Sequence, residues 1–203
     1  MKQTGNIFVS RIETGVSGIF NQSASRRMRQ HATYSDEELF TMLGMAEERN
    51  AAFTELYRRY EKRVWSYARI SLQNDQRAKD ATQDTFLRIL KTGEKGATSV
   101  EHFAAYIMRI VRNIVINDQQ RKRHDTVDID TVEIPSAAAA TYEQQEINTI
   151  LETAMQLLPD DYRDAFSMQT YGGMSYQDIA DTQQVPLSTV RNRVVRAKAK
   201  LRE

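Results

Sequence analysis

The 203-residue sequence contains no cysteine, only three prolines and only eight glycines. The absence of cysteine excludes disulfides, thiolate metal sites and a cysteine nucleophile, and it fits a reducing compartment. Few prolines and glycines, together with many Ala, Leu, Arg and Gln residues, favour helices. We therefore expect an all-α protein.

Long apolar segments are also missing. No run of about 18 apolar residues is present, so we expect no insertion into a membrane. The first residues lack the apolar core of a signal peptide, so we expect a cytoplasmic protein. The 28 basic and 27 acidic residues nearly balance. The net charge therefore predicts no partner, and only the distribution of charge along the chain is informative.

Motifs for catalysis or metal binding are absent as well. The three histidines, His31, His102 and His124, are far apart and lack the spacing of metal ligands. No glycine-rich phosphate loop and no nucleophile motif is found. We predict no catalytic residue, no metal site, no cofactor and no enzymatic activity.

The N-terminal part of the chain begins with a polar segment. Residues 1–35 include a basic cluster at Arg26, Arg27 and Arg29 and predict a flexible tail. Ser35, followed by three acids, then predicts a helix start. Apolar residues at steps of three and four continue this pattern as one long helix to about residue 68.

Two more helices are predicted after this one. The first runs from about residue 77 to residue 91 and is ended by Gly93 and Gly96. The second has an apolar stripe from Phe103 to Ile114 and ends in a basic tail. Together these helices predict a compact bundle over residues 36–124. The side chains expected in its core include Trp65, Ala78, Ala81, Thr85, Phe86, Ile89 and Tyr106.

The charge pattern reverses after the first bundle. Residues 125–146 contain six acids and no Lys or Arg, which predicts a flexible acidic linker. An alternative is that this charge mimics nucleic acid or keeps the segment off DNA. Residues 147–203 then predict a second bundle, with one helix that carries Leu157 and Leu158 and ends before Pro159.

The C-terminal segment, Ser175 to Arg202, has the pattern of a helix-turn-helix. Ser175 can cap its first helix, and Pro186 can stand in the first turn of its second. Six basic residues and no acid follow between Arg191 and Arg202. This predicts a helix that enters a DNA groove, with a solvated basic helix as the alternative. The expected contacts are Ser188, Thr189, Arg191, Asn192, Arg193, Arg196 and Lys198.

The chain from about Glu48 to Arg202 resembles the extracytoplasmic-function (ECF) sigma factors, the small two-domain members of the sigma-70 family. The order and spacing of several motifs carry the resemblance. They are FTELYRRYEKRVWSYA (Phe53–Ala68), AKDATQDTFLRIL (Ala78–Leu90), FAAYIMRIVRNIVIN (Phe103–Asn117), LLPDDYRDAFSMQTYGGMSYQDIA and STVRNRVVRAKAKLR.

The resemblance implies a division of labour between the two bundles. The N-terminal bundle resembles the sigma-2 domain, which docks on the β′ clamp helices of core RNA polymerase and helps to open the promoter −10 element. The C-terminal bundle resembles the sigma-4 domain, which reads the −35 element and meets the β flap. The implied polymerase contacts are Asp80, Gln83, Asp84, Phe86 and Arg88. The implied −10 contacts are Arg109, Arg112, Asn113, Asn117, Arg121, Lys122 and Arg123.

The sequence departs from the family pattern at three places. Acids common before the polymerase-docking helix are replaced at Arg77 and Lys79, Thr82 replaces an apolar residue, and Gln183-Gln184 replaces an apolar-Gly turn. A left-handed non-glycine residue costs about 1 kcal/mol, so we expect this turn to take another shape.

The first two departures raise a regulatory hypothesis. A phosphate adds about −1.5 to −2 charges and could replace the missing acids. A Ser/Thr kinase would then act in place of an anti-sigma factor, and a conventional anti-sigma factor remains the alternative. The candidate positions are Thr54, Ser71, Thr82 and Thr85. The main competing function is a two-domain helix-turn-helix regulator that acts without core polymerase.

Overall fold

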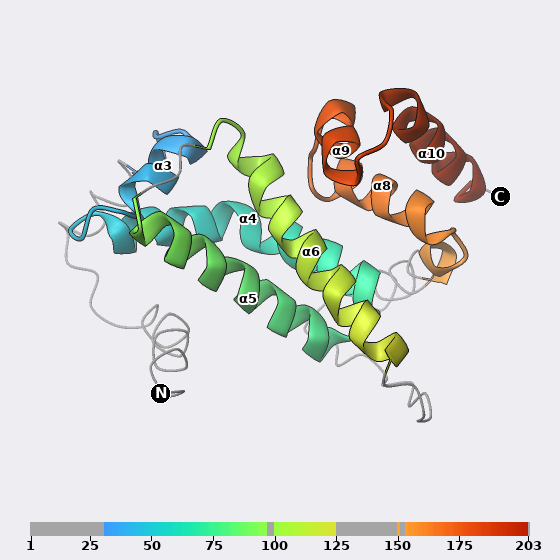
Figure 1. Ribbon diagram of the computed structural model, residues 1–203, viewed down its shortest axis with the longest axis horizontal. Helices are drawn as coiled ribbons and strands as arrows, with labels where there is room; N and C mark the ends of the chain where they lie inside the picture. Colours follow the sequence, from blue (N-terminus) through green and yellow to red (C-terminus); the bar gives the residue numbers. More distant parts are fainter. Residues whose placement is uncertain (1–30, 97–99, 125–149, 151–152, 203) are drawn as a thin grey trace. The chain divides into compact units, whose positions relative to one another are not determined.

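Every regular element that the structure describes is an α-helix (Figure 1), which confirms the predicted fold class. The computed structural model describes residues 31–96, 100–124, 150 and 153–202. The predicted acidic linker and nearly all of the predicted tail lie outside these residues. The helices are α3 (Asp36–Met42), α4 (Arg49–Leu72), α5 (Asp75–Glu94), α6 (Phe103–His124), α8 (Asp160–Thr170), α9 (Tyr176–Gln183) and α10 (Leu187–Lys200).

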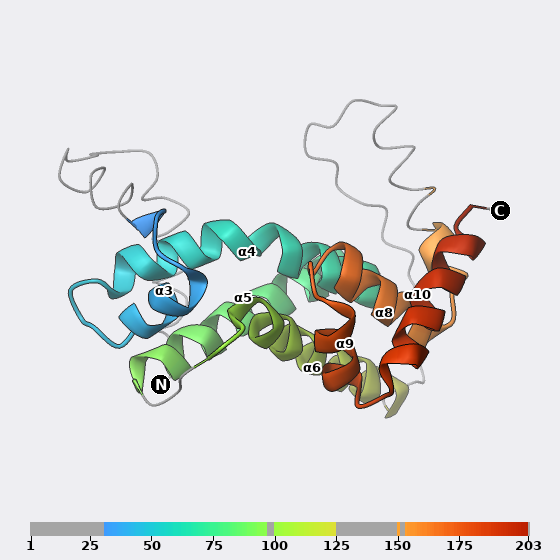
Figure 2. The ribbon, with the colours of Figure 1, turned by 90° about the horizontal axis from the view of Figure 1, so that it is seen from above.

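Helices α3 to α10 belong to one compact unit, and residues 31–34 are a separate turn in which Tyr34 N donates to His31 O at 3.3 Å. Within the unit, α3, α4, α5 and α6 pack on one another (Figures 1 and 2). The inner face predicted for α5 is buried throughout. Local apolar spacing was therefore sufficient to find this core face.

The prediction of one continuous helix from Ser35 to about residue 68 is wrong. α3 ends at Met42, and α4 begins at Arg49. The chain between them lies against α5, where a Cβ on Gly93 would be 2.5 Å from Leu43 Cβ. Gly93 therefore permits a close approach inside α5 and does not end it. The left-handed glycine after α5 is Gly96, with φ +65°.

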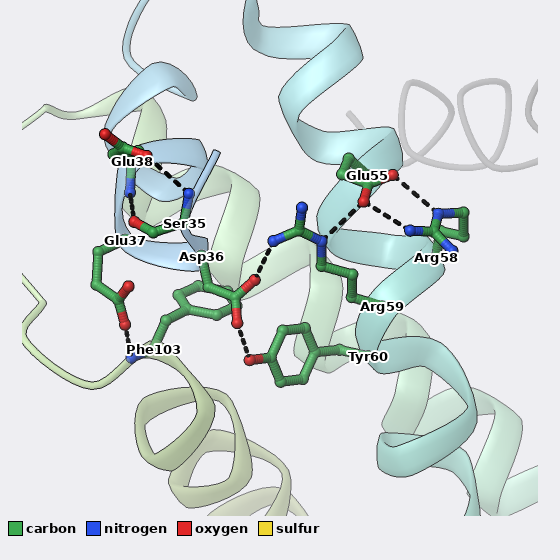
Figure 3. Close-up of polar contacts among 9 residues, drawn as sticks. All are labelled: Ser35, Asp36, Glu37, Glu38, Glu55, Arg58, Arg59, Tyr60 and Phe103. Carbon is green, nitrogen blue, oxygen red and sulfur yellow. Dashed lines mark hydrogen bonds and ion pairs between the residues drawn. The ribbon is translucent and has the colours of Figure 1, made fainter. Parts of the chain in front are cut away.

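A polar network joins α3 to its neighbours (Figure 3). Ser35, predicted as a helix cap, forms a capping box with Glu38. Asp36 accepts hydrogen bonds from Arg59 Nη1 at 2.6 Å and from the Tyr60 hydroxyl, and Glu37 Oε1 accepts from Phe103 N at 3.0 Å. The acids of the first helical turn therefore fix α3 to both α4 and α6.

Glu55 is a buried carboxylate on α4 beside this network. It accepts from Arg58 Nε at 2.8 Å and from Arg59 Nε at 2.7 Å. The hydrogen bond from Arg58, assisted by Arg59, lowers the pKa of Glu55 from 4.5 to about 2 against the opposing effect of burial. Glu55 therefore stays ionised in the folded protein well below neutral pH.

The C-terminal helices enclose an apolar cluster of Met155, Leu158, Phe166 and Ala197. Five residues have the apolar character and spacing that suit the crossing of α9 and α10; Ile179, Ala180, Val190 and Val194 are buried there, whereas Val185 is half-buried. The capping box of α9 pairs Ser175 with Asp178. Pro186 stands at the N-cap of α10, one position before the first turn where the sequence predicted it.

One predicted core residue is exposed. Trp65, on α4, is 38% exposed, whereas its neighbour Val64 is fully buried. One residue along a helix rotates the side chain by about 100°, which turns Trp65 off the buried face. Tyr106, in contrast, packs edge-on against Phe40 with ring centroids 5.6 Å apart, as predicted.

Candidate nucleic-acid interface

α10 is amphipathic, with basic and polar side chains on its exposed face. Val190, Val194 and Ala197 are buried on the opposite face. Five of the predicted DNA contacts are exposed, namely Ser188, Arg191, Asn192, Arg196 and Lys198, while Thr189 is half-buried. The exposed face of α10 therefore offers cationic, amide and hydroxyl groups to a ligand.

Arg193, also a predicted DNA contact, has intramolecular partners. Its Nη1 donates to Gln183 Oε1 at 2.8 Å, and its Nη2 lies 3.0 Å from Asp161 Oδ2. Its side chain is 20% exposed. In this structure Arg193 therefore belongs to the packing between α8, α9 and α10 and not to the exposed face.

The turn before α10 is left-handed. The sequence analysis expected another shape, because the turn has no glycine. Gln184 has φ 55° and ψ 45°, and its N–H closes α9 on Ala180 O. The predicted change of turn shape is therefore wrong. Gln183, the preceding residue, uses its side chain to bridge Arg193 and Asp164.

α6 carries a second polar face. Arg109, Asn113, Asn117 and Arg121 are exposed at steps of four residues, so they form one stripe. Arg112 is off this stripe, and its Nε donates to Asp164 Oδ2 at 2.8 Å. Lys122 and Arg123 continue α6, but their side chains lie outside the described residues.

The predicted polymerase-docking helix, α5, exposes Asp80, Gln83, Asp84 and Arg88. Phe86 is different, because it is only 3% exposed and its ring packs against Tyr57 with centroids 4.6 Å apart. A buried ring cannot contact a partner directly. Phe86 therefore supports the docking face from the core and is removed from the set of contacts.

The two basic residues at the start of α5 differ in environment. Arg77 Nε donates to Asp118 Oδ2 on α6 at 2.8 Å, and its Nη2 donates to the same oxygen. Lys79 is exposed. The positive charge at position 77 therefore has an intramolecular role, whereas the charge at position 79 contributes to the surface.

The candidate phosphorylation sites also separate by exposure. Thr82 and Thr85 are buried, and their hydroxyls donate to Ala78 O at 2.8 Å and to Ala81 O at 2.7 Å. Thr54 is exposed and Ser71 is half-buried. The burial of Thr82 suits the apolar residue that the family resemblance implies at this position.

The sequence analysis missed Asp164 on α8, a carboxylate that accepts three side-chain hydrogen bonds. Its Oδ1 accepts from the Tyr67 hydroxyl at 2.6 Å, and its Oδ2 accepts from Arg112 Nε at 2.8 Å and Gln183 Nε2 at 2.9 Å. Burial, followed by the charge of Asp164, raises the pKa of the Tyr67 hydroxyl well above its usual value. We refer to Tyr67, Arg112, Asp164 and Gln183 as the Asp164 cluster.

One sequence signal pointed toward this cluster. Tyr67 lies on the apolar stripe of α4, and a buried tyrosine hydroxyl requires a hydrogen-bond partner. The partner itself comes from a distant helix, so local spacing could not identify it. A cavity of about 340 Å³ adjoins the cluster and is lined by its four residues together with Ser71, Arg193 and others.

The described part of the chain offers neither a metal site nor a membrane span. Among the described residues, no three His, Cys, Asp or Glu side chains are placed to hold a metal ion. None of the helices described is both long and apolar enough to cross a bilayer.

Comparison with known proteins connects the two groups of helices to one family. Residues 56–125 match the family Sigma-70 region 2, and residues 148–201 match Sigma-70, region 4. The chain is 31% identical over 154 residues to the ECF RNA polymerase sigma factor SigM of Mycobacterium tuberculosis. The aligned residues cover 74% of this chain and 75% of SigM. The chain belongs to the ECF sigma factors of the sigma-70 family.

This ECF sigma factor has further relatives. It is 28% identical over 158 residues to the ECF sigma factor SigE of Mycolicibacterium smegmatis, and it spans 61% of the length of that protein and 75% of its own. Its fold matches the sigma factor RpoE in a complex with the anti-sigma factor NepR from Bartonella quintana. That match has a TM-score of 0.59 at 23% identity and covers 73% of this chain and 93% of RpoE.

Membership of the family decides the class of function. ECF sigma factors direct RNA polymerase in transcription initiation and are not enzymes. The resemblance stated from the sequence motifs is therefore confirmed, and the chain is a DNA-binding transcription factor.

Proposed function

We propose that this sigma factor binds core RNA polymerase through the exposed face of α5 and contacts promoter DNA through α6 and α10. The observation that supports this most is the exposed face of α10, which carries Arg191, Asn192 and Arg196 and no acid. Arginine can bind guanine O6 and N7 bidentately in the major groove. α10 is therefore the helix that reads the −35 element.

α6 is the helix that meets the −10 element in this proposal. Its stripe of Arg109, Asn113 and Asn117 is exposed and ends near Arg121. Amides can hydrogen-bond the edges of unpaired bases, and arginines can bind phosphates. A stripe of this composition suits a strand whose bases have left the duplex.

α5 supplies the polymerase contact. Asp80 and Asp84 lie one helical turn apart on its exposed face, beside Gln83. Carboxylates at this spacing suit a basic partner helix such as the clamp helices of the β′ subunit. The C-terminal bundle would meet the β flap, so the two bundles would contact different parts of the polymerase.

Transcription from defined promoters tests this proposal. The purified full chain is combined with core polymerase and a library of promoter fragments, and transcript starts are mapped. Arg191→Ala should lower initiation at the preferred promoter roughly tenfold, because one bidentate base contact is worth about 1–3 kcal/mol. Lys200→Ala is the matched control, since Lys200 is basic and exposed on α10 but outside the contact set.

Two results would contradict the proposal. A chain that binds duplex DNA alone but yields no transcripts with core polymerase would be a helix-turn-helix regulator of the competing type. Equal losses from Arg191→Ala and Lys200→Ala would mean that α10 contributes only general positive charge.

The regulation that we propose is phosphorylation at Thr54 by a Ser/Thr kinase. Thr54 is exposed and follows Phe53, whose ring contacts the ring of Phe86 on α5 with centroids 6.2 Å apart. A phosphate there would add negative charge near a docking helix that exposes Lys79. Ser71 is the second candidate, and it lines the cavity beside the Asp164 cluster.

Binding to core polymerase distinguishes the two forms of control. Thr54→Glu should bind core polymerase several-fold more tightly than Thr54→Ala, whereas Thr170→Glu, an exposed position on α8, should have no effect. If both Thr54 variants, and Ser71→Glu as well, bind like the wild type, the kinase hypothesis fails. Control by an anti-sigma factor, the kind of partner seen with RpoE of Bartonella quintana, then becomes the better proposal.

A further inference from the structure

Gln183 has no part in the proposed function, yet its side chain is fully engaged. It ends α9 at a position where the family resemblance implies an apolar residue, and it precedes the left-handed residue Gln184. Its Nε2 donates to Asp164 Oδ2 at 2.9 Å, and its Oε1 accepts from Arg193 Nη1 at 2.8 Å. An apolar side chain could form neither hydrogen bond. Gln183 therefore adds a polar link between α8 and α10 that the family pattern does not imply.

Arg193 is held at both of its terminal nitrogens. Nη1 donates to Gln183, and Nη2 lies 3.0 Å from Asp161 Oδ2. The side chain is only 20% exposed, whereas the neighbouring residues Arg191 and Asn192 are exposed. Hydrogen bonds that involve a charged group are stronger than neutral ones, so Arg193 extends to a phosphate only at the cost of these contacts. We refer to Asp161, Gln183 and Arg193 as the Arg193 bridge.

The Arg193 bridge lies entirely within the region 4 match. Its three residues belong to α8, α9 and α10. Arg191, Arg196 and Lys198 on α10 are exposed, whereas Arg193 is directed toward α8 and α9. Gln183 therefore influences the direction of one arginine of the helix that we propose reads DNA.

We infer that Gln183 is a positioning residue that withdraws Arg193 from promoter DNA and so lowers the sequence-independent part of DNA binding. The inference rests on the proposed function of α10. Each phosphate that a cationic side chain neutralises releases counterions, and this release adds affinity for any duplex. A phosphate contact carries no sequence information. Withdrawing Arg193 therefore weakens binding to all sequences alike and leaves the base contacts of Arg191 and Asn192 in place.

NMR spectroscopy of the full chain tests the Arg193 bridge without DNA. The guanidinium protons of Arg193 should exchange slowly with water in the parent chain, because they are hydrogen-bonded and largely buried. Gln183→Met keeps the length of the side chain but neither hydrogen bond, so it should speed this exchange several-fold. Gln177→Met is the matched control, because Gln177 is on the same helix and its Nε2 donates to Asp181 Oδ1 within α9. It should leave the exchange of Arg193 unchanged.

The salt dependence of DNA binding tests the functional consequence. Core polymerase assembled with the full chain is titrated with two duplex fragments, one with the preferred −35 element and one with that element scrambled. Gln183→Met should steepen the slope of log Kobs against log salt by about 0.9, which corresponds to one additional phosphate contact. The affinity should rise about five- to tenfold for both fragments at about 0.1 M salt. Because the rest of the polymerase is the same in every titration, the change in slope reports on the substituted residue.

Two further variants assign the change in slope to Arg193. The double variant Gln183→Met/Arg193→Met lacks the released charge, so its slope should return to the parent value. Asp161→Asn opens the bridge from its other side, so it should steepen the slope even if Gln183→Met folds poorly. Asp160→Asn is the control for Asp161→Asn, because it removes the same charge from the same helix, and the ion pair of Asp160 with Arg163 stays within α8. It should change the slope less than Asp161→Asn.

The outcomes separate this inference from the proposed function. Unchanged exchange of the Arg193 protons in Gln183→Met, equal salt slopes of Gln183→Met and the parent, or a steeper slope that persists in the double variant would each overturn the inference. Weaker binding of Gln183→Met to both fragments would also overturn it, because Gln183 would then support DNA binding. The proposed function fails instead if the polymerase with the parent chain does not distinguish the two fragments. That comparison involves no substitution at Gln183, so the two failures are distinguishable.

Discussion

Arg77 of α5 and Asp118 of α6 form an ion pair in which both Nε and Nη2 of the arginine donate to one carboxylate oxygen. The side chains are 27% and 28% exposed. Arg77 stands at one of the positions where the family resemblance implies an acid. In this chain its charge therefore joins α5 and α6, both within the region 2 match, and is not available as a simple surface charge.

Replacing Arg77 should harm the fold, whereas replacing Lys79 should not. Arg77→Asp would put two carboxylates in contact and lower the free energy of unfolding by roughly 1–2 kcal/mol. Lys79→Glu changes an exposed residue and should stay within about 0.5 kcal/mol of the wild type. Urea unfolding of the two variants measures the difference.

A charge-swapped double variant provides the control for this prediction. Arg77→Asp/Asp118→Arg restores an ion pair and should recover most of the lost stability. If Arg77→Asp is as stable as the wild type, the ion pair contributes nothing. Tests of acidic substitutions on polymerase binding should accordingly use Lys79→Glu alone.

Gly93→Ala should destabilise the protein, although alanine favours helices. The new Cβ would lie 2.5 Å from Leu43 Cβ, which is too close to the backbone to move freely. Overpacking of this kind costs about 1–3 kcal/mol, against a gain of about 1 kcal/mol in helix propensity. We expect a net loss of about 1 kcal/mol in thermal or urea unfolding. Lys91→Ala, exposed on the same helix, should be nearly neutral.

Gln184→Gly should stabilise the helix-turn-helix. Gln184 is left-handed, with φ 55°, and glycine adopts this conformation without the steric cost of a Cβ. We expect a gain of about 0.5–1 kcal/mol. Gln177→Gly, inside α9, should instead lose about 0.5 kcal/mol. Equal effects of the two substitutions would mean that the turn is not strained.

The stability of the fold should fall in acid because of Glu55. Its folded pKa of about 2 lies below the ordinary value of 4.5. Its contribution is therefore fully present above about pH 4.5 and is lost as the pH falls through 2. Glu55 contributes on the order of 2 kcal/mol to the free energy of unfolding, because water around the exposed Arg58 screens part of the interaction. Unfolding measured from about pH 6 to about pH 2.5 should show this decline.

Glu55→Gln provides the comparison for the pH measurement. This variant keeps an oxygen acceptor but has no carboxylate to protonate, so its stability should depend less on pH in the same range. Lys62→Gln controls for the loss of an exposed charge on α4. A pH profile of Glu55→Gln that parallels the wild type would assign the acid sensitivity to other groups.

The predictions that succeeded rest on neighbours in sequence. Ser35 and Ser175 were found as caps because a capping box spans only four residues. The buried face of α5 was found because helical periodicity is local. The family resemblance also came from motifs in order, which do not require knowledge of the tertiary structure.

Several predictions that failed depend on contacts between distant segments. The break between α3 and α4 follows from the packing of Leu43 against Gly93, and the Asp164 cluster unites residues from four helices. Phe86 was assigned to the docking surface by family pattern, yet its place is decided by Phe53 and Tyr57. Spacing along the chain contains no information on such contacts.

The buried hydroxyls of Thr82 and Thr85 have a consequence for the timing of any modification. Thr85 is fully buried, and its hydroxyl is bonded to the preceding helical turn. A kinase could reach it only in the small population in which α5 has locally opened, so the rate would follow that opening equilibrium. A phosphate placed there could not return to the core. Modification of Thr85 would thus trap α5 in its opened state and remove the helix that we propose docks on polymerase, whereas modification of Thr54 would leave it folded.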